Sequence, residues 1–187
     1  AIDVARRHLG MEADIELELF FTETGKFTDE GMYQNQEEPG VRNERPIVYA
    51  NIKDDGTIVL ELDRKLLTNM DQMLSAVFYE LSMLELSRFM DFGEDSGVLI
   101  ELFALANGFG IYIANALTSS DQWTGISHQG WSVSVGGFMP EPFAAYALAY
   151  FNEYQGNTSD WDKYLSKHMR KMYKRNLKYL RSSADHN

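Results

Sequence analysis

The hydrophobic pattern of the chain changes from strand-like to helix-like about one third of the way along. Residues 14–21 alternate acidic and apolar side chains, as expected of a half-buried strand. Residues 47–52 and 57–62 flank the turn signal Asp54-Asp55-Gly56, which predicts a β-hairpin. From residue 63 to about 181 the apolar residues recur mostly at intervals of three and four, which predicts mainly helices. We therefore expect an α+β fold with a small N-terminal sheet followed by a predominantly helical part.

The N-terminal part contains two further predicted segments. Residues 4–9 can form a helical turn or two, which Gly10 stops. Residues 22–46 combine glycines and prolines with many polar side chains, which predicts a long loop. Residues 1–62 are thus expected to hold mainly strands and this loop, within a single domain that spans residues 1–187.

Four helices are predicted in the second part of the chain, with a loop or a short extended excursion between the second and the third. Their expected ranges are 71–89, 95–117, 140–156 and 160–181, and the excursion covers residues 118–139. Thr68 or Asp71 is expected to cap the first helix. The second helix reads as buried nearly all round. Gly108 and Gly110 lower its helix propensity, which indicates that another helix backbone passes close by.

The composition sets limits on compartment and membrane association. The chain has no cysteine, so it offers neither a disulfide framework nor a thiolate metal site. It lacks an uninterrupted apolar run of about 20 residues and a signal-peptide pattern at its start, so we expect no membrane span. We expect a cytoplasmic protein, and the alanine at position 1 leaves open a processed or truncated chain start.

The net charge of −11 is distributed unevenly. Eight of the 17 Lys and Arg residues lie between residues 163 and 181, whereas residues 1–160 hold 9 basic and 26 acidic residues, a net charge of −17. An acidic body repels nucleic acid, so no nucleic-acid partner is expected. The basic segment could bind phosphate groups. It also carries an apolar stripe, however, and we therefore favour docking of this helix against its own domain.

One predicted helix carries the spacing of a zinc site without the usual ligands. In H-E-x-x-H, two histidines lie four residues apart on one helical face, and the glutamate activates the zinc-bound water. In this chain Tyr79 and Met83 stand at the histidine positions, and Glu80 stands at the glutamate position. A thioether is a poor zinc ligand and a neutral tyrosine is a weak one, so an ordinary zinc site cannot form from these side chains.

The order of elements resembles the zincin metallopeptidase architecture, in which a small sheet ending in a hairpin precedes the helix with the zinc motif. Residues 101–115 look like the second helix of uncharacterised bacterial zincin-like proteins. The Gly-Trp and Tyr-Ala-Leu-Ala signatures of those proteins are matched by residues 130–132 and 146–149. The resemblance implies that Glu101 keeps the position of an acidic third ligand, while Glu80 keeps that of the catalytic glutamate.

The missing histidines change the function that the resemblance implies. We expect a catalytically inactive zincin-like protein, a pseudoenzyme with a binding or regulatory role, and a protein partner that it recognises through the old cleft. One alternative is a metal-dependent hydrolase with a non-standard carboxylate site at Glu80 and Glu101, holding an ion other than zinc or none. Another is an acidic immunity-type protein that neutralises a basic toxin, suggested by charge and size. No resident cofactor is expected, and the oligomeric state stays open.

The candidate site has two interpretations at the level of side chains. Glu80 and Glu101 could share a proton, because neighbouring acids in an apolar site disfavour double ionisation. We favour instead a buried Glu80 that is hydrogen-bonded to a backbone group or to a tyrosine. His128 and Trp131 are candidate cleft residues. His128 could swing in as a ligand, although a lone loop histidine is more often exposed or structural.

Overall fold

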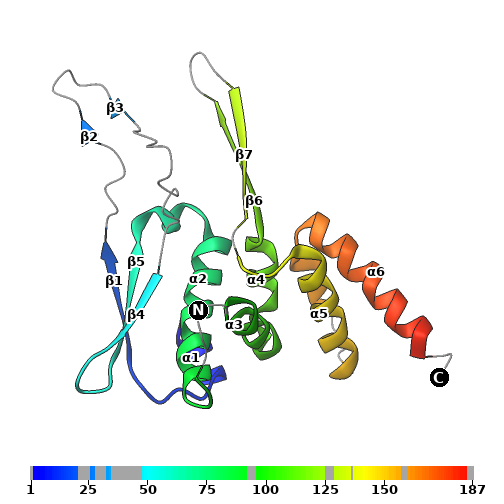
Figure 1. Ribbon diagram of the computed structural model, residues 1–187, viewed down its shortest axis with the longest axis horizontal. Coiled ribbons are helices and arrows are strands. Elements are labelled where there is room, and N and C mark those ends of the chain that lie inside the picture. Colours follow the sequence, from blue (N-terminus) through cyan, green and yellow to red (C-terminus); the bar gives the residue numbers. More distant parts are fainter. Residues whose placement is uncertain are drawn as a thin grey trace.

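The structure, a computed structural model, is a mixed α+β fold with a small three-stranded sheet and a mostly helical remainder (Figure 1). It describes residues 2–20, 26–27, 33–34, 48–91, 96–124, 129–135, 137–156 and 160–184, of which 26–27, 33–34, 118–124 and 129–135 are described by their main chain alone. The predicted fold class is confirmed at this level.

The sheet has the strand order β1-β5-β4, with β1 (Ile15–Phe20) parallel to β5 (Ile58–Asp63) and β4 (Val48–Ile52) antiparallel to it. The predicted hairpin is confirmed. The Lys53 N–H donates to the Thr57 carbonyl oxygen at 2.9 Å, and Gly56 adopts a φ of +87°, a conformation that favours glycine.

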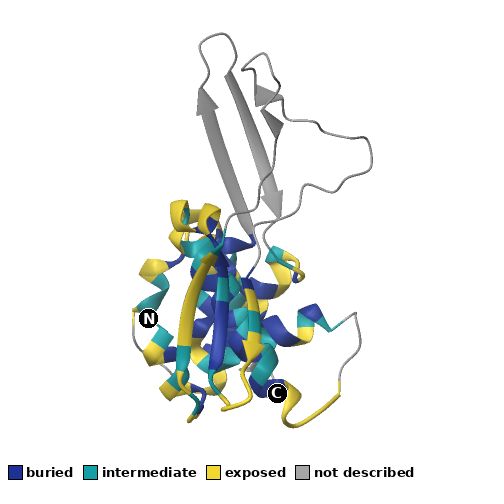
Figure 2. Cartoon of the chain, turned by 90° about the vertical axis from the view of Figure 1, so that its left-hand side faces the viewer, coloured by how far each residue is buried: buried dark blue, intermediate teal, exposed yellow. Residues whose placement is uncertain are grey.

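The predicted strand at residues 14–21 forms as β1, but the expectation that it is half-buried is wrong. Leu17 and Leu19 are each about half exposed, although Leu60, opposite Leu17 on β5, is fully buried. Figure 2 shows the central strand buried between more exposed neighbours. Alternation identifies the side chains that share a face of the strand. Whether a helix covers that face is decided by the packing, and the first long helix packs against β4.

The N-terminal helix and the first long helix form close to where they were predicted. Helix α1 (Ile2–His8) ends before Gly10, whose φ is +70°. A short 3-10 helix, η1 (Arg64–Thr68), precedes α2 (Met70–Ser87). The predicted cap at Thr68 or Asp71 is wrong, because Asn69 caps α2 by accepting the Gln72 N–H at 3.2 Å. Thr68 belongs to the 3-10 helix, so Asn69 is the residue with extended backbone directly before α2.

The predicted helix at 95–117 is broken into three parts. Helix α3 (Gly97–Ala104) leads into a π-helical segment, η2 (Leu105–Phe109), and then into α4 (Gly110–Ala116). Asn107 and Gly108 are not helical, and the φ of Gly108 is +87°. The Asn107 side chain stabilises the kink by donating to the Phe103 carbonyl oxygen at 2.8 Å. The apolar pattern continues through the kink, so hydrophobic periodicity alone does not reveal it.

The two glycines of this segment have different roles. A Cβ atom at Gly110 would lie 2.6 Å from Leu148 Cδ2, so a side chain of α5, rather than the predicted helix backbone, approaches closely there. A Cβ atom at Gly108 would lie 3.5 Å from His8 Nε2, an ordinary van der Waals distance. Gly108 is therefore favoured by its positive φ rather than by crowding.

The stretch Gly97–Ala116 is long and apolar enough to cross a membrane by length and composition, with a mean hydropathy of 1.7. Half of the stretch is buried inside the protein, and the kink at Asn107 and Gly108 interrupts it. It forms a central part of the core.

Residues 118–139 contain a regular hairpin. β6 (Thr118–Thr124) pairs antiparallel with β7 (Gln129–Val135), so the extended alternative of the prediction is the one observed. Within the predicted loop at 22–46, β2 (Lys26–Phe27) and β3 (Tyr33–Gln34) form a short antiparallel pair. The rest of that segment lies outside the described residues.

The last two helices pack side by side and run parallel. Helix α5 (Glu141–Tyr154) follows Pro140 and is closed by Gly156, as predicted. The basic helix starts later than expected, because a 3-10 helix, η3 (Trp161–Tyr164), precedes α6 (Lys167–Ala184). His168 Nε2 lies 3.4 Å from a Glu141 carboxylate oxygen at the start of the two helices, and an ion pair joins Glu153 to Arg181 near their ends. Figure 1 shows both helices starting at the same end.

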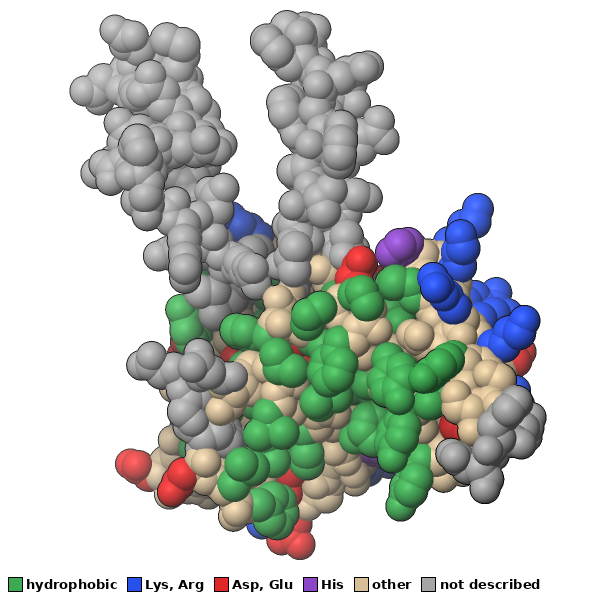
Figure 3. Space-filling view, turned by 45° about the vertical axis from the view of Figure 1, so that its right-hand side comes forward, with side chains coloured by type: hydrophobic (Ala, Val, Ile, Leu, Met, Phe, Trp, Pro, Cys, Tyr) green, Lys and Arg blue, Asp and Glu red, His purple; other side chains and the backbone are tan. Residues whose placement is uncertain are grey.

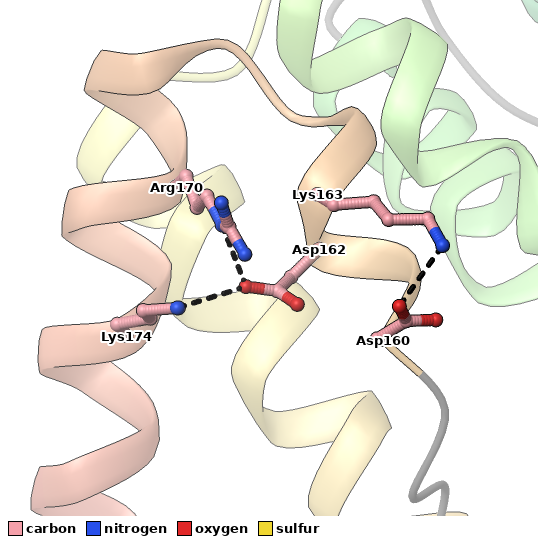
Figure 4. Close-up of polar contacts among 5 residues, drawn as sticks. All are labelled: Asp160, Asp162, Lys163, Arg170 and Lys174. Atoms are coloured by element: carbon pink, nitrogen blue, oxygen red, sulfur yellow. Dashed lines mark hydrogen bonds and ion pairs between the residues drawn. The ribbon is translucent and has the colours of Figure 1, made fainter.

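The prediction that the basic helix docks against its own domain is confirmed. Met169 and Tyr173 of α6 are buried in a hydrophobic cluster with Ala145, Leu148 and Ala149 of α5. Asp162, just before α6, accepts from Arg170 at 2.8 Å and lies 3.4 Å from Lys174 (Figure 4). Asp162 thus holds η3 against α6.

Candidate functional site

Glu80 lies on α2 and faces the edge strand of the sheet. Its carboxylate, which is partly buried, accepts a hydrogen bond from the main-chain N–H of Ala50 on β4. Burial raises the pKa of Glu80 to about 7, and the hydrogen bond opposes this shift only in part. Glu80 is therefore a carboxyl group that can gain or lose a proton near neutral pH.

Tyr79 lies within electrostatic reach of both carboxylates. Burial first, and then the negative charges of Glu80 and Glu101, raise the pKa of Tyr79 to about 12. The Tyr79 ring stacks on Phe138, with 5.4 Å between ring centroids and an interplanar angle of 23°. At physiological pH Tyr79 is thus a neutral phenol covered on one face by an aromatic ring.

Glu101 lies on α3 and is only 3% exposed. Its two carboxylate oxygens accept main-chain hydrogen bonds from Phe138 N–H at 2.9 Å and from Met139 N–H at 2.6 Å. A Cβ atom at Gly137 would lie 2.5 Å from Glu101 Oε1, so the chain can approach the carboxylate this closely because residue 137 is glycine. The Glu101 carboxylate anchors the segment that leads into α5.

The same segment also covers the start of α3. A Cβ atom at Gly97 would collide with Cγ of Phe138, so the Phe138 ring rests directly on the glycine backbone. Sequence reasoning treated residues 137–139 as part of a loop and did not connect them with the candidate site. The available signal was the Gly136-Gly137 pair directly before Phe138, since paired glycines often mark a close backbone approach.

The structure brings three of the predicted site residues into one region, namely Tyr79, Glu80 and Glu101. Met83 follows one turn after Tyr79 on α2 and is partly buried. The raised pKa of Glu80 comes from burial rather than from a neighbouring carboxylate. His128 lies outside the described residues, and Trp131 is described only by its main chain, which pairs with Gln122 in the β6-β7 hairpin.

The described side chains around Tyr79, Glu80 and Glu101 do not form a metal-binding site. Among those side chains, no three from His, Cys, Asp or Glu gather where they could hold a metal ion. Both carboxylate oxygens of Glu101 accept main-chain hydrogen bonds, and the Glu80 carboxylate accepts one from the Ala50 N–H. In chemical terms the region can exchange one proton at Glu80 and can present the Tyr79 hydroxyl as a hydrogen-bond donor.

A second surface with functional character lies on α5 and α6. Tyr146, Tyr150 and Tyr154 form an exposed ladder along α5, with centroid separations of 6.5 and 6.4 Å between successive rings. In Figure 3, which brings the α5 and α6 side forward, hydrophobic side chains gather on one face and Lys and Arg side chains lie along its edge. We call this region the α5–α6 surface.

The exposed cations of α6 extend the α5–α6 surface. The exposed basic residues of α6 for which the described part of the chain provides no ion pair are Lys167, Lys171, Arg175 and Lys178. Lys167, Lys171 and Arg175 follow each other at intervals of four, which places like charges next to one another on the helix. Such spacing costs the helix a little stability and presents a positive stripe to solvent.

Comparisons of the chain with protein-family models, with curated proteins and with solved structures found no match.

Proposed function

We propose that this protein has a binding or regulatory role on a zincin-like scaffold that lacks conventional zinc peptidase chemistry. The observation that carries this proposal is the environment of Glu101. In the resemblance, Glu101 stands at the position of an acidic zinc ligand. Its carboxylate oxygens accept from Phe138 and Met139 and thus serve to position the chain before α5. Tyr79 and Met83 at the histidine positions support the same conclusion.

The partner in this proposal is a protein with an acidic and partly apolar surface, and it binds the α5–α6 surface. Exposed tyrosines are favourable at protein interfaces, because they bury a large area at a low cost in conformational entropy. The positive stripe of α6 provides charge complementarity to an acidic partner. The cytoplasmic location expected from the sequence belongs to the same proposal.

Metal content tests the loss of zinc chemistry. Protein purified without chelators or nickel affinity resin is analysed by elemental mass spectrometry, alongside Glu80→Gln and Glu101→Gln. We expect no stoichiometric metal in any of the three samples. Stoichiometric metal that is lost in Glu80→Gln or Glu101→Gln would contradict the proposal and support the hydrolase alternative.

Partner capture tests the binding role. Tagged wild-type protein, Tyr150→Ala with Lys171→Glu, and the control Leu17→Ala are used as baits, and any captured protein is then purified and titrated directly. Leu17 is a suitable control because it is an exposed apolar residue on β1, away from the α5–α6 surface. We expect an acidic partner that binds wild type and Leu17→Ala and binds the double variant at least tenfold more weakly. If the captured partner binds the double variant as tightly as wild type, the assignment of the α5–α6 surface is wrong.

The immunity-type alternative makes a different prediction in the same experiment. A basic toxin would bind the acidic body of the chain through its surplus of Asp and Glu residues. Its binding would weaken with salt and would not weaken in the Lys171→Glu variant. A basic partner with this behaviour would favour the immunity-type function.

The enzyme alternative is favoured by one observation, the pKa of Glu80 near 7. A carboxyl group with this pKa is suited to general acid–base catalysis at neutral pH. The discriminating measurement is hydrolysis of a mixed peptide library by wild type and by Glu80→Gln. Cleavage by wild type that is lost in Glu80→Gln would replace the binding role with an enzymatic one.

A further inference from the structure

A pocket of about 320 Å³ lies between α1, the kink in η2, α5 and η3. Its lining includes His8, Leu105, Gly108, Phe151, Asn152 and Trp161. The pocket shares no residue with the Glu80 and Glu101 region or with the tyrosine ladder of α5. We propose that it binds a small, mainly apolar molecule that carries one hydrogen-bond acceptor.

The kink in η2 creates one wall of the pocket. Ala106, Gly108 and Gly110 line it and present main chain with little or no side chain. Gly108 holds the left-handed conformation at the break, so a larger residue is disfavoured there. Interruptions of this π-helical kind inside α-helices occur frequently at functional sites. The kink thus opens space that a continuous helix with ordinary side chains would fill.

Asn152 provides the polar group that defines the ligand. It is only 6% exposed, and its Oδ1 accepts a hydrogen bond from Trp161 Nε1 at 3.0 Å. Because the indole N–H can only donate, the amide orientation is determined, and the Nδ2 group is left for the pocket that Asn152 lines. No hydrogen-bond partner of this Nδ2 group occurs in the part of the chain that the structure describes. A ligand acceptor such as a carbonyl oxygen would satisfy this donor.

The remaining walls set the size and polarity of the ligand. Leu105, Ile111, Leu148 and Phe151 form apolar walls. The volume falls at the lower end of the range of small-molecule sites, which runs from about 300 to 1,000 Å³. Among the described residues that line the pocket, only His8 can carry a positive charge, so a phosphorylated ligand is poorly matched. A neutral, mainly apolar carbonyl compound fits both the walls and the Asn152 donor.

Two matched probes test this assignment by NMR spectroscopy on the full chain. The probes are 2-acetylnaphthalene and 2-ethylnaphthalene, which have similar shapes and differ by the carbonyl acceptor. We expect 2-acetylnaphthalene to cause saturable shifts of the Asn152 side-chain amide and the Trp161 indole N–H signals. We expect 2-ethylnaphthalene to bind about 3–10-fold more weakly, the factor that corresponds to one net hydrogen bond.

A pocket-filling variant with a matched control completes the test. Ala106→Leu places extra carbon atoms in the pocket, whereas Ala76→Leu enlarges a half-buried helical alanine on α2 outside it. We expect at least tenfold weaker binding of 2-acetylnaphthalene to Ala106→Leu and unchanged binding to Ala76→Leu. If Ala106→Leu does not fold, Ile111→Phe closes the same pocket from α4.

Three outcomes would overturn the assignment. These are the absence of saturable shifts with both probes, equal affinity for both probes, and binding that survives in the filled variant. None of these outcomes bears on metal content or on partner capture, so this inference and the proposed function can fail independently.

Discussion

The carboxylate of Glu101 accepts a 2.6 Å hydrogen bond from the main-chain N–H of Met139, 38 residues further along the chain. A second hydrogen bond comes from the N–H of Phe138. Both donors lie directly before α5, so one buried side chain on α3 holds the segment that leads into α5. The acid that the zincin resemblance assigns to a metal is thus a structural anchor in the geometry observed here.

Loss of this anchor should destabilise the protein. Glu101→Gln keeps the shape but loses the charge, and we expect the free energy of unfolding to fall by about 1–3 kcal/mol. Glu101→Ala leaves two buried N–H groups without their acceptor, so it should cost more than Glu101→Gln. Urea denaturation measures both values. The control Glu12→Gln, at an exposed position, should change the value by less than about 0.5 kcal/mol. Equal effects of Glu101→Gln and Glu12→Gln would show that the anchor does not stabilise the fold.

Glu80 should make stability depend on pH in the direction opposite to a salt-bridged carboxylate. Its folded pKa of about 7 exceeds the ordinary value of 4.5, so the native state binds the proton more tightly than the unfolded state. The contribution of Glu80 is therefore full below pH 4.5 and decreases as the pH rises through 7. Relative to wild type, Glu80→Gln should gain about 1–3 kcal/mol between pH 5 and pH 8, a range discounted for residual solvent screening. Urea denaturation at both pH values checks this, and an equal difference at both would contradict it.

Gly137 and Gly97 should respond differently to alanine. At Gly137 the new methyl group meets Glu101 Oε1 and Leu117 Cδ2, both at 2.5 Å and both in buried side chains, so we expect a loss of about 1–3 kcal/mol. At Gly97 it meets the ring of Phe138, which is 57% exposed and can swing outward. Alanine also has a higher helix propensity than glycine, and at the first residue of α3 this gain is less than the roughly 1 kcal/mol of a helix interior, so the net change at Gly97 should be small. Thermal unfolding compares the two variants, and a larger loss at Gly97 would show that Phe138 cannot move.

The acidic residues before α6 provide a matched pair. Asp162 contacts Arg170 and Lys174 and has 15% of its side chain exposed, whereas Asp160 contacts only Lys163 in Figure 4 and has 80% exposed. The hydrogen bond from Arg170 first, and then that from Lys174, lower the pKa of Asp162. We expect Asp162→Asn to lose about 0.5–1 kcal/mol at pH 7 and Asp160→Asn to lose less.

The pH dependence of the Asp162 effect follows from the same shift. A lowered folded pKa means that the contribution is fully present above the ordinary value of 3.8 and is lost as the pH falls through the lower folded pKa. Chemical denaturation should therefore show a smaller difference between wild type and Asp162→Asn at pH 3 than at pH 7. An equal difference at both pH values would mean that the side chain acts through its shape rather than its charge.

Ser82 should be replaceable. It is fully buried on α2, and its Oγ has no hydrogen-bond partner in the part of the chain that is described. A buried hydroxyl group without a partner contributes a desolvation cost, and alanine has the higher helix propensity. We expect Ser82→Ala to leave the free energy of unfolding unchanged or to raise it by up to about 1 kcal/mol. A loss of more than that in thermal and urea unfolding would reveal a partner for the hydroxyl group.

Local chemistry made several elements predictable. The hairpin around Gly56 and the limits of α5 at Pro140 and Gly156 rest on residues whose backbone preferences act within a few positions. The cap of α2 was missed because Asn69 becomes the capping residue only after a 3-10 turn has used Thr68. The break at Gly108 was missed because the apolar side chains continue across it.

The amino-acid pattern was sufficient to specify an α+β fold, most helix and strand positions, the docking of the basic helix, and the lack of histidines at positions 79 and 83. These properties depend on residue type and on short spacing, and both are visible in a linear chain. Tertiary packing decided that Glu101 turns toward Phe138 and Met139, that Glu80 reaches Ala50, and that a pocket opens beside Gly108. Each of these contacts joins residues far apart in the sequence. Their hydrogen bonds and burial depend on the complete fold, which no local pattern encodes.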